Sequence, residues 1–155
     1  MLDLYDELVS VVTRLNESQI QYALCGGLAM AVHGRARATV DVDLLVRVEA
    51  YDALKQAVAN AGYTFEARPM QFRSGLEIRR LTKADAASGD HVMLDLLLVY
   101  PGIEDVWEQR KRIDWNGISL SVVDKPGLIK LKDQRGSGQD LDDIAWLTST
   151  KNSST

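Results

Sequence analysis

Hydrophobic residues recur along the chain with two different periods, and these periods predict where helices and strands lie. Near the start they fall at Leu4, Leu8, Val11, Val12 and Leu15, which is the spacing of one helix face. Roughly the first sixteen residues are therefore predicted to form an amphipathic helix with an acidic outer face.

A strand, a glycine turn and a short helix are predicted next. The apolar segment 20–24 has the character of a short strand, which Gly26 and Gly27 interrupt. Segment 28–33 is rich in Ala and Met, and Gly34 closes it, so this segment predicts a short helix.

Two later runs, 40–46 and 92–100, are largely apolar and predict buried strands. Acids interrupt these runs at Asp41, Asp43 and Asp95. The surrounding segments predict a helix over 49–61, strands over 63–66 and 76–81, and a short helix over 104–110.

Turn and cap signals organise the last third of the chain. Asn116 and Gly117 predict a tight hairpin, because both residues tolerate positive φ angles. Asp124 is predicted to cap a helix whose first turn holds Pro126. Asp140 is predicted to cap a last helix after a Gly-Ser-Gly interruption.

Composition narrows the class of protein. With 155 residues, 46% hydrophobic and 26% charged, the chain has the balance of one globular domain. We expect that domain over residues 1–150, with a polar, disordered tail over 151–155. The net charge of −4 argues against a general polyanion binder or a protein held on acidic membranes. No apolar stretch is long enough to cross a bilayer, so a cytoplasmic location is expected.

Cysteine and histidine offer little metal chemistry. Cys25 is the single cysteine, which excludes an internal disulfide and a cysteine-based zinc cluster. The two histidines are far apart, and His33 is interpreted as a helix-end residue rather than a base. Carboxylates, cations, hydroxyls and backbone groups remain as candidates.

The three acids in the apolar strands are the main chemical signal. Asp41 and Asp43 point to the same side of a strand, about 7 Å apart. Asp95 lies in another apolar strand, where its charge has to be compensated by a counterion. A hard divalent cation, Mg²⁺ or Mn²⁺, would supply it, because only oxygen ligands are on offer. The alternative is that Asp41 and Asp43 lie at a strand end and pair with Arg35 and Arg37, while Asp95 pairs elsewhere on the surface.

The glycine turn and a later pair of cations are candidate phosphate contacts. Backbone N–H groups at Gly26 and Gly27 are accessible to an anion, although a purely structural turn is the alternative. Lys132 and Arg135 are three residues apart and share a helix face, which is also the pattern of ordinary solvated charges.

Residues just before the acid pair are further candidates. Arg35, Arg37 and Thr39 are close enough in sequence to touch a ligand held by the acids. Loop arginines more often pair with neighbouring acids.

Together these motifs resemble a known family. The matching segments are 22–29, 33–35, 37–44 and 94–96, which carry the glycine pair, the Asp-x-Asp and the later strand Asp. This combination resembles the minimal nucleotidyltransferases of the DNA polymerase β superfamily, in particular the AbiEii-like group found as toxins of toxin–antitoxin pairs. The C-terminal segment 132–144 is also similar to that group's pattern.

The resemblance implies an α+β fold, in which helices flank a mixed sheet, and a nucleoside triphosphate as substrate. It implies that Asp41 and Asp43 hold the metal, and that Asp95 completes the metal site and helps to deprotonate the attacking hydroxyl. The glycine turn would cover the triphosphate. Many members of the family have Ser where this chain has Gly27.

The resemblance also implies contacts to the phosphate tail. Lys132, with Arg135 and Lys130, would neutralise the phosphates, and Arg37 and Thr39 are further nucleotide-binding candidates.

The leading hypothesis is a Mg²⁺-dependent transfer of a nucleoside monophosphate to an acceptor hydroxyl. The acceptor could be tRNA or another RNA docked on Arg79, Arg80 and Lys83, a protein side chain, or a small molecule such as an antibiotic. An antitoxin would be a partner if the chain is a toxin. The alternatives are a catalytically inactive nucleotide-binding or interaction module of the same fold and a structural member of a two-protein complex.

Overall fold

Eight strands form one mixed sheet in the computed structural model, which describes residues 2–35, 39–135 and 138–151. The order across the sheet is β3-β5-β6-β2-β1-β8-β7, and β4 pairs with β5 beside this path. The strands are β1 (Ala23–Cys25), β2 (Asp41–Val46), β3 (Phe65–Glu66), β4 (Met70–Gln71), β5 (Glu77–Ala84), β6 (His91–Leu98), β7 (Lys111–Trp115) and β8 (Ile118–Val122).

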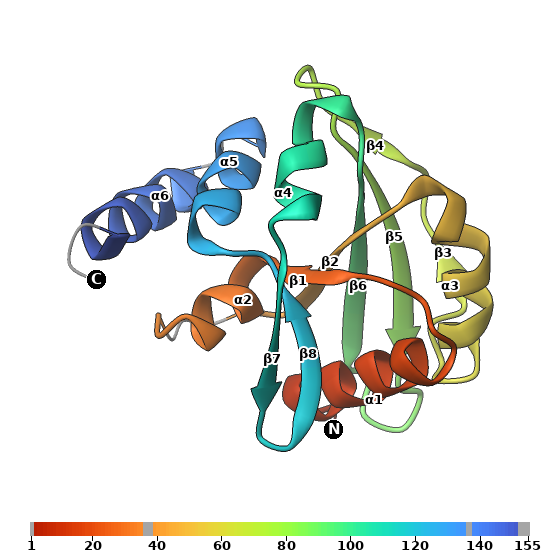
Figure 1. Ribbon diagram of the computed structural model, residues 1–155. Coiled ribbons are helices and arrows are strands. Elements are labelled where there is room, and N and C mark those ends of the chain that lie inside the picture. Colours follow the sequence, from red (N-terminus) through yellow and green to blue (C-terminus); the bar gives the residue numbers. More distant parts are fainter. Residues whose placement is uncertain (1, 36–38, 136–137, 152–155) are drawn as a thin grey trace.

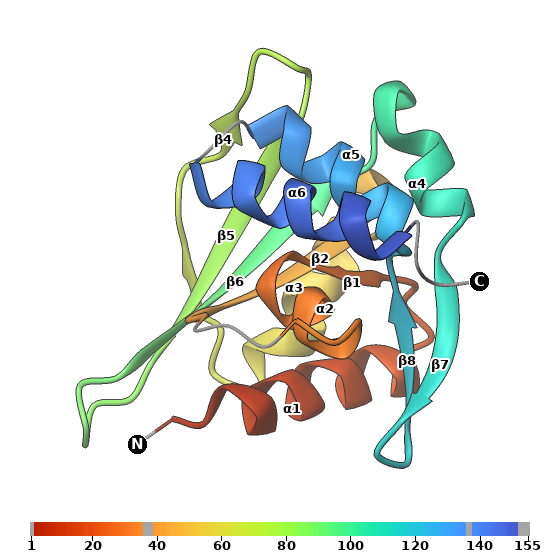
Figure 2. The same cartoon turned by 90° about the vertical axis from the view of Figure 1, so that its left-hand side faces the viewer.

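Helices flank this sheet, as the α+β prediction requires. They are α1 (Leu4–Glu17), α2 (Gly26–Val32), α3 (Tyr51–Ala59), α4 (Glu104–Glu108), α5 (Lys125–Arg135) and α6 (Gly138–Lys151), with short 3₁₀ turns η1 (Val48–Ala50) and η2 (Pro101–Ile103). Helices α2, α5 and α6 lie on one side of the sheet, and α3 lies on the other (Figures 1 and 2). No helix in the described ranges is long and apolar enough to cross a membrane.

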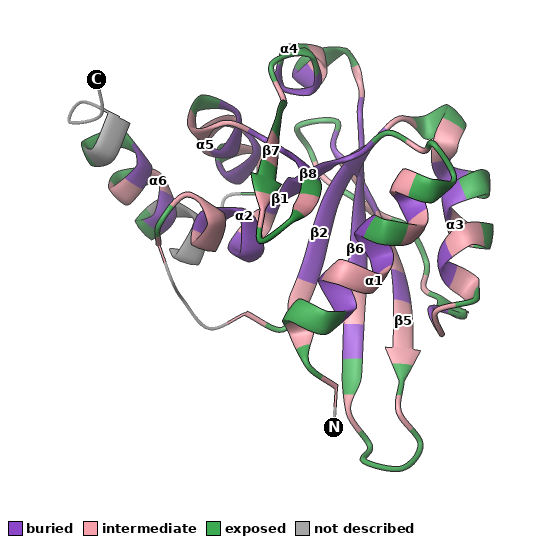
Figure 3. Cartoon of the chain, turned by 60° about the horizontal axis from the view of Figure 1, so that its bottom comes forward, coloured by how far each residue is buried: buried purple, intermediate pink, exposed green. Residues whose placement is uncertain are grey.

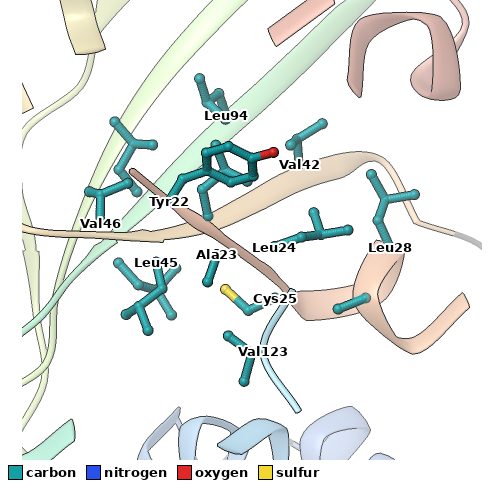
Figure 4. Close-up of a cluster of buried hydrophobic side chains, with 14 of the residues drawn as sticks. Tyr22, Ala23, Leu24, Cys25, Leu28, Val42, Leu45, Val46, Leu94 and Val123 are labelled. Atoms are coloured by element: carbon teal, nitrogen blue, oxygen red, sulfur yellow. The ribbon is translucent and has the colours of Figure 1, made fainter. Parts of the chain in front are cut away.

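The centre of the sheet is β2, which runs parallel to β6 and antiparallel to β1. From Val42 to Val46 every residue of β2 is buried, because helices cover both faces of the strand. Figure 3 shows this burial along β2 and the exposed outer surfaces of α1 and α3. The core around β1 and β2 is built from aliphatic side chains such as Leu24, Leu45 and Leu94, together with Tyr22 (Figure 4).

The predicted caps and turns are confirmed in two places. Asn116 and Gly117 have φ angles of 53° and 83°, the positive values that a tight hairpin between β7 and β8 requires. Asp124 Oδ1 accepts a hydrogen bond from the Gly127 N–H at 2.9 Å and so caps the first turn of α5.

Other boundaries differ from the sequence prediction. The first strand is limited to Ala23–Cys25, and α2 begins at Gly26 rather than at residue 28. The prediction of an N-cap at Asp140 is wrong. Helix α6 begins at Gly138, so residue 140 lies inside the first turn, where an acid is also favoured by the helix dipole.

Candidate active site

Strand register places the three predicted acids on one face of the sheet. Asp43 in β2 is directly opposite Asp95 in the parallel strand β6, and Asp41 lies two residues before Asp43. Because side chains alternate along a strand, Asp41 and Asp43 project to the same side. That side carries helix α5, whose Arg135 reaches towards Asp43.

Asp95 is held by an arginine of the neighbouring strand. Arg80 in β5 is its register partner, and Nε and Nη2 of this arginine donate to the two carboxylate oxygens at 2.7 and 2.9 Å. The Asp95 side chain is only 1% exposed. Arg80 is therefore the counterion of Asp95, where the sequence predicted a divalent cation, and this bidentate pair engages both oxygens of the acid.

The other two acids keep buried oxygens without hydrogen-bond partners. These are Oδ1 of Asp41 and Oδ1 of Asp43, and the contact that approaches the second is Arg135 Nη1 at 3.9 Å. Unsatisfied buried oxygens are costly, so they mark a place where a cation would be favourable. Within the described ranges, no group of three or more His, Cys, Asp or Glu side chains converges as metal ligands.

The electrostatics of the site disfavour the charged form of both acids and so raise the pKa of each. Burial, followed by repulsion from Asp95, raises the pKa of Asp43 to about 7 against attraction from Arg135. Burial and the charge of Asp95 also raise the pKa of Asp41. Binding of a cation would oppose both effects.

Gly26 fits tightly against Asp43. Its φ angle is +68°, and a Cβ placed there would lie 2.2 Å from Oδ2 of Asp43. A side chain at this position would therefore displace the carboxylate. Gly27 is buried in the first turn of α2. The glycine turn thus brings backbone into direct contact with Asp43.

Helices α5 and α6 contribute a buried ion-pair cluster beside the turn. Lys132 Nζ lies 3.1 Å from Oδ2 of Asp143, and Arg35 Nε lies 3.3 Å from Oδ1 of the same acid. Both Lys132 and Asp143 are buried. The guanidinium of Arg35 also lies 5.6 Å from the ring of Trp146. Arg35 therefore pairs with α6 and not with the acids of β2. The alternative in which Arg35 neutralises Asp41 or Asp43 is thus excluded for this arginine.

One small pocket joins these groups. It is lined by Cys25, Gly26, Asp43, Leu97, Leu128, Leu131, Lys132 and Arg135. The pocket lies where β1 gives way to α2 and α5 crosses the sheet, so its cations face Asp43, whose Oδ1 has no hydrogen-bond partner. This combination suits an anionic ligand that arrives together with a metal ion.

Several other predicted contacts lie elsewhere. Lys130 Nζ pairs with the exposed Asp105 at 2.9 Å, away from the pocket. Thr39 donates to the Asp41 carbonyl at 3.5 Å, and its side chain lines a separate hollow between the chain start and β6. Arg37 lies outside the described residues.

The prediction that Arg79, Arg80 and Lys83 form one patch for RNA is wrong. Arg80 faces Asp95, whereas Arg79 pairs with Glu77 at 2.7 Å and Lys83 pairs with Glu7 at 2.9 Å. Strand alternation separates the first from the other two. The three cations therefore form no common patch.

Sequence reasoning missed the roles of Arg80 and Asp143. The signal for Arg80 was its place in an amphipathic strand beside the run that carries Asp95, but the register could not be read from the sequence. For Asp143, the sequence showed only that an acid lies close to an apolar residue in the predicted last helix, which does not reveal that it is buried. Its partners, Arg35 and Lys132, come from distant segments.

Comparison with known proteins identifies the class that this fold and site define. The chain belongs to the aminoglycoside-2″-adenylyltransferase family, whose model matches residues 7–86. This membership confirms the predicted enzyme class, a nucleotidyltransferase. No significant match was found among curated proteins.

Solved structures share the fold at low sequence identity. The lincosamide antibiotic adenylyltransferase LnuA, solved with lincomycin, superposes with a TM-score of 0.62 at 14% identity, covering 93% of this chain and 96% of its own. ANT(2″)-Ia in complex with adenylyl-2″-tobramycin gives 0.61 at 12% identity, covering 94% and 87%. A Thermotoga maritima protein described as a nucleotidyltransferase gives 0.56 at 11% identity, covering 96% and 90%.

Proposed function

We propose that this chain transfers a nucleoside monophosphate from a nucleoside triphosphate to a hydroxyl of a small-molecule acceptor, with AMP as the expected nucleoside monophosphate. The observation that carries the proposal is the pair of buried carboxylates, Asp41 and Asp43, whose Oδ1 atoms lack hydrogen-bond partners. Asp43 lines a pocket together with Gly26 of the glycine turn and the cations Lys132 and Arg135 of α5.

A divalent cation fits this acid pair. Two unpartnered carboxylate oxygens on one strand face are the donor set that Mg²⁺ or Mn²⁺ prefers. Asp41 and Asp43 would hold the ion. When bound, it would polarise the α-phosphate and stabilise the charge that develops on the leaving pyrophosphate.

The residues around the acids have complementary roles in this proposal. Gly26 and Gly27 present backbone at close range to the triphosphate, and Lys132 and Arg135 neutralise its negative charge. Asp95 would complete the metal site and accept the proton of the attacking hydroxyl. For that role, Arg80 has to release at least one of the two oxygens that it now occupies.

The names of the relatives support a small-molecule acceptor. The family is described by aminoglycoside adenylylation, and LnuA acts on a lincosamide. An RNA acceptor has less support, because the three cations expected to dock it face different sides of β5. The AbiEii-like toxin assignment, with an antitoxin partner, remains a separate hypothesis about biological role.

A second candidate is a nucleotide-binding module without turnover. It is favoured by the Arg80 clamp on Asp95 and by Gly27 at the position where many relatives of the sequence motif carry Ser. Such a module would bind ATP without transferring AMP to any acceptor.

The test is a label-transfer assay. Purified chain is incubated with each α-labelled nucleoside triphosphate, Mg²⁺ and, in separate reactions, lincomycin, tobramycin or total RNA. We expect metal-dependent labelling of a small molecule, which is lost in Asp43→Asn and kept in Asp105→Asn, a control that removes an exposed acid. ATP binding without label transfer would favour the second candidate, and equal transfer by Asp43→Asn would defeat the proposal.

A further inference from the structure

A row of side chains that begins at Asp41 runs across the sheet. Asp41 is the register partner of Met93. Met93 is in turn opposite Thr82, and Thr82 is opposite Phe65. Directly opposed residues of neighbouring strands project to the same face. The row therefore crosses β2, β6, β5 and β3 and spans roughly 14 Å at about 4.8 Å per strand.

The neighbours of this row confirm which face it occupies. Glu66, next to Phe65, points to the opposite side and accepts hydrogen bonds from Tyr51 and Lys55 of α3. Leu81, next to Thr82, is buried. Alternation therefore directs the row away from α3, to the side on which Asp41 and Asp43 lie.

This part of the sheet is open. Phe65 is 69% exposed, and Met93, Thr82 and Asp41 are half-buried. An exposed aromatic ring at one end, a thioether in the middle and a carboxylate at the other end form a shallow platform. We refer to Phe65, Thr82 and Met93 as the apolar row.

The charge of the platform distinguishes between kinds of acceptor. None of the three side chains of the apolar row is charged, and the charge of the adjoining Arg80 is paired with Asp95. A molecule with several ammonium groups needs carboxylates around it to offset its desolvation. The apolar row has no carboxylate of its own for such a molecule, and Asp41, at the end of the platform, would be taken up by the metal ion of the proposed function.

The position of the apolar row matches that of an acceptor. Gly26 contacts Asp43 from the β1 side of β2, whereas the row extends from Asp41 on the β6 side. In a displacement at phosphorus the attacking and leaving oxygens are roughly in line. With the pyrophosphate by the glycine turn, the acceptor hydroxyl approaches from the side of the apolar row.

We propose that the apolar row binds the acceptor, and that the acceptor is an uncharged or singly charged molecule whose apolar ring lies several strand spacings from its reacting hydroxyl, in preference to a polycationic aminoglycoside. This inference rests on the proposed function and names the substrate class of that site. The ring would stack on Phe65 and contact the methyl group of Met93.

Methyl NMR on chain labelled with [methyl-¹³C]methionine tests this proposal without requiring turnover. The Met93 signal is assigned with Met93→Leu, and phenyl β-D-glucoside and tobramycin are titrated in turn with Mg²⁺ and a non-hydrolysable ATP analogue present. We expect the glucoside, but not tobramycin at equal concentration, to shift the Met93 signal. Phe65→Ala should weaken this binding roughly threefold to tenfold, and the control Val48→Ala, which trims an exposed residue outside the row, should leave it unchanged.

The outcomes separate this inference from the proposed function. A Met93 shift by tobramycin at equal or higher affinity, or binding of the glucoside that Phe65→Ala leaves unaltered, would overturn the role of the apolar row. A glucoside-specific shift that depends on Phe65 supports the row, even if label transfer fails in every reaction. Failure of transfer alone counts against the proposed function.

Discussion

Two buried acids on opposite faces of the sheet have opposite surroundings. Glu7 of α1 accepts a hydrogen bond from the Tyr63 hydroxyl at 3.0 Å and from Lys83 Nζ at 2.9 and 3.2 Å. Asp43 of β2 is as deeply buried, yet its Oδ1 has no hydrogen-bond partner. The first acid has its hydrogen bonds satisfied within the fold, whereas the second has the under-satisfied surroundings that we propose serve a ligand.

The largest expected effect is on turnover at the under-satisfied acid. Asp43→Asn should lower the rate of label transfer by about 100-fold or more, because it removes a charged oxygen from the proposed metal site. Glu7→Gln should retain most of the rate at temperatures where it is folded. Rates of AMP transfer under saturating Mg²⁺ check both variants. Comparable losses of rate in the two variants would contradict the claim that Asp43, unlike Glu7, serves turnover.

Stability should respond in the reverse order. Glu7→Gln is expected to lose roughly 1–3 kcal/mol of unfolding free energy, because Lys83 is left without its charged partner. Asp43→Asn should be at least as stable as wild type without metal, since it relieves a buried, repelled charge. Urea denaturation of both variants at pH 8 measures the difference.

A smaller effect is expected on the pH dependence of stability. The pKa of Asp43 is raised by burial and by Asp95 to about 7, whereas an unfolded aspartate titrates near pH 4. The unfolded chain therefore loses this proton first, and the free energy of unfolding falls as pH rises from about 4 to 7. Above pH 7 the effect levels off.

Asp43→Asn removes that contribution. Thermal melts from pH 4 to 8 should show a flatter profile for the variant than for wild type over this interval. Parallel profiles would mean that Asp43 is ionised in the folded chain well below pH 7.

The smallest expected change concerns the clamp on the third acid. Arg80→Met frees both oxygens of Asp95 and adds an uncompensated negative charge next to Asp43. We expect Mn²⁺ to bind about threefold more tightly to this variant, measured by the midpoint of a metal-induced melting shift. Arg79→Met, on the α3 face, is the matched control and should bind Mn²⁺ like wild type.

Local patterns predicted much of the fold, because period and turn chemistry are local. The helix over the first sixteen or so residues, the hairpin at Asn116 and the cap at Asp124 all follow from neighbouring residues. The start of α6 was misjudged, because Asp140 is a good cap residue and also a favourable first-turn residue. Sequence alone does not distinguish these positions.

The candidate site was predicted only where it depends on strand alternation. Asp41 and Asp43 share a face for that reason. Gly26 contacts Asp43 where β1 ends. Register between strands and pairing between distant helices are not local. The Arg80 clamp on Asp95 and the Asp143 cluster therefore could not be derived from spacing.

The most direct test of the central claim is a crystal structure with Mn²⁺ and a non-hydrolysable ATP analogue, read by anomalous scattering. The account predicts a Mn²⁺ peak within about 2.2 Å of a carboxylate oxygen from each of Asp41 and Asp43, with the analogue's phosphates next to Gly26. Nucleotide bound elsewhere, or a peak that neither carboxylate contacts, would contradict it.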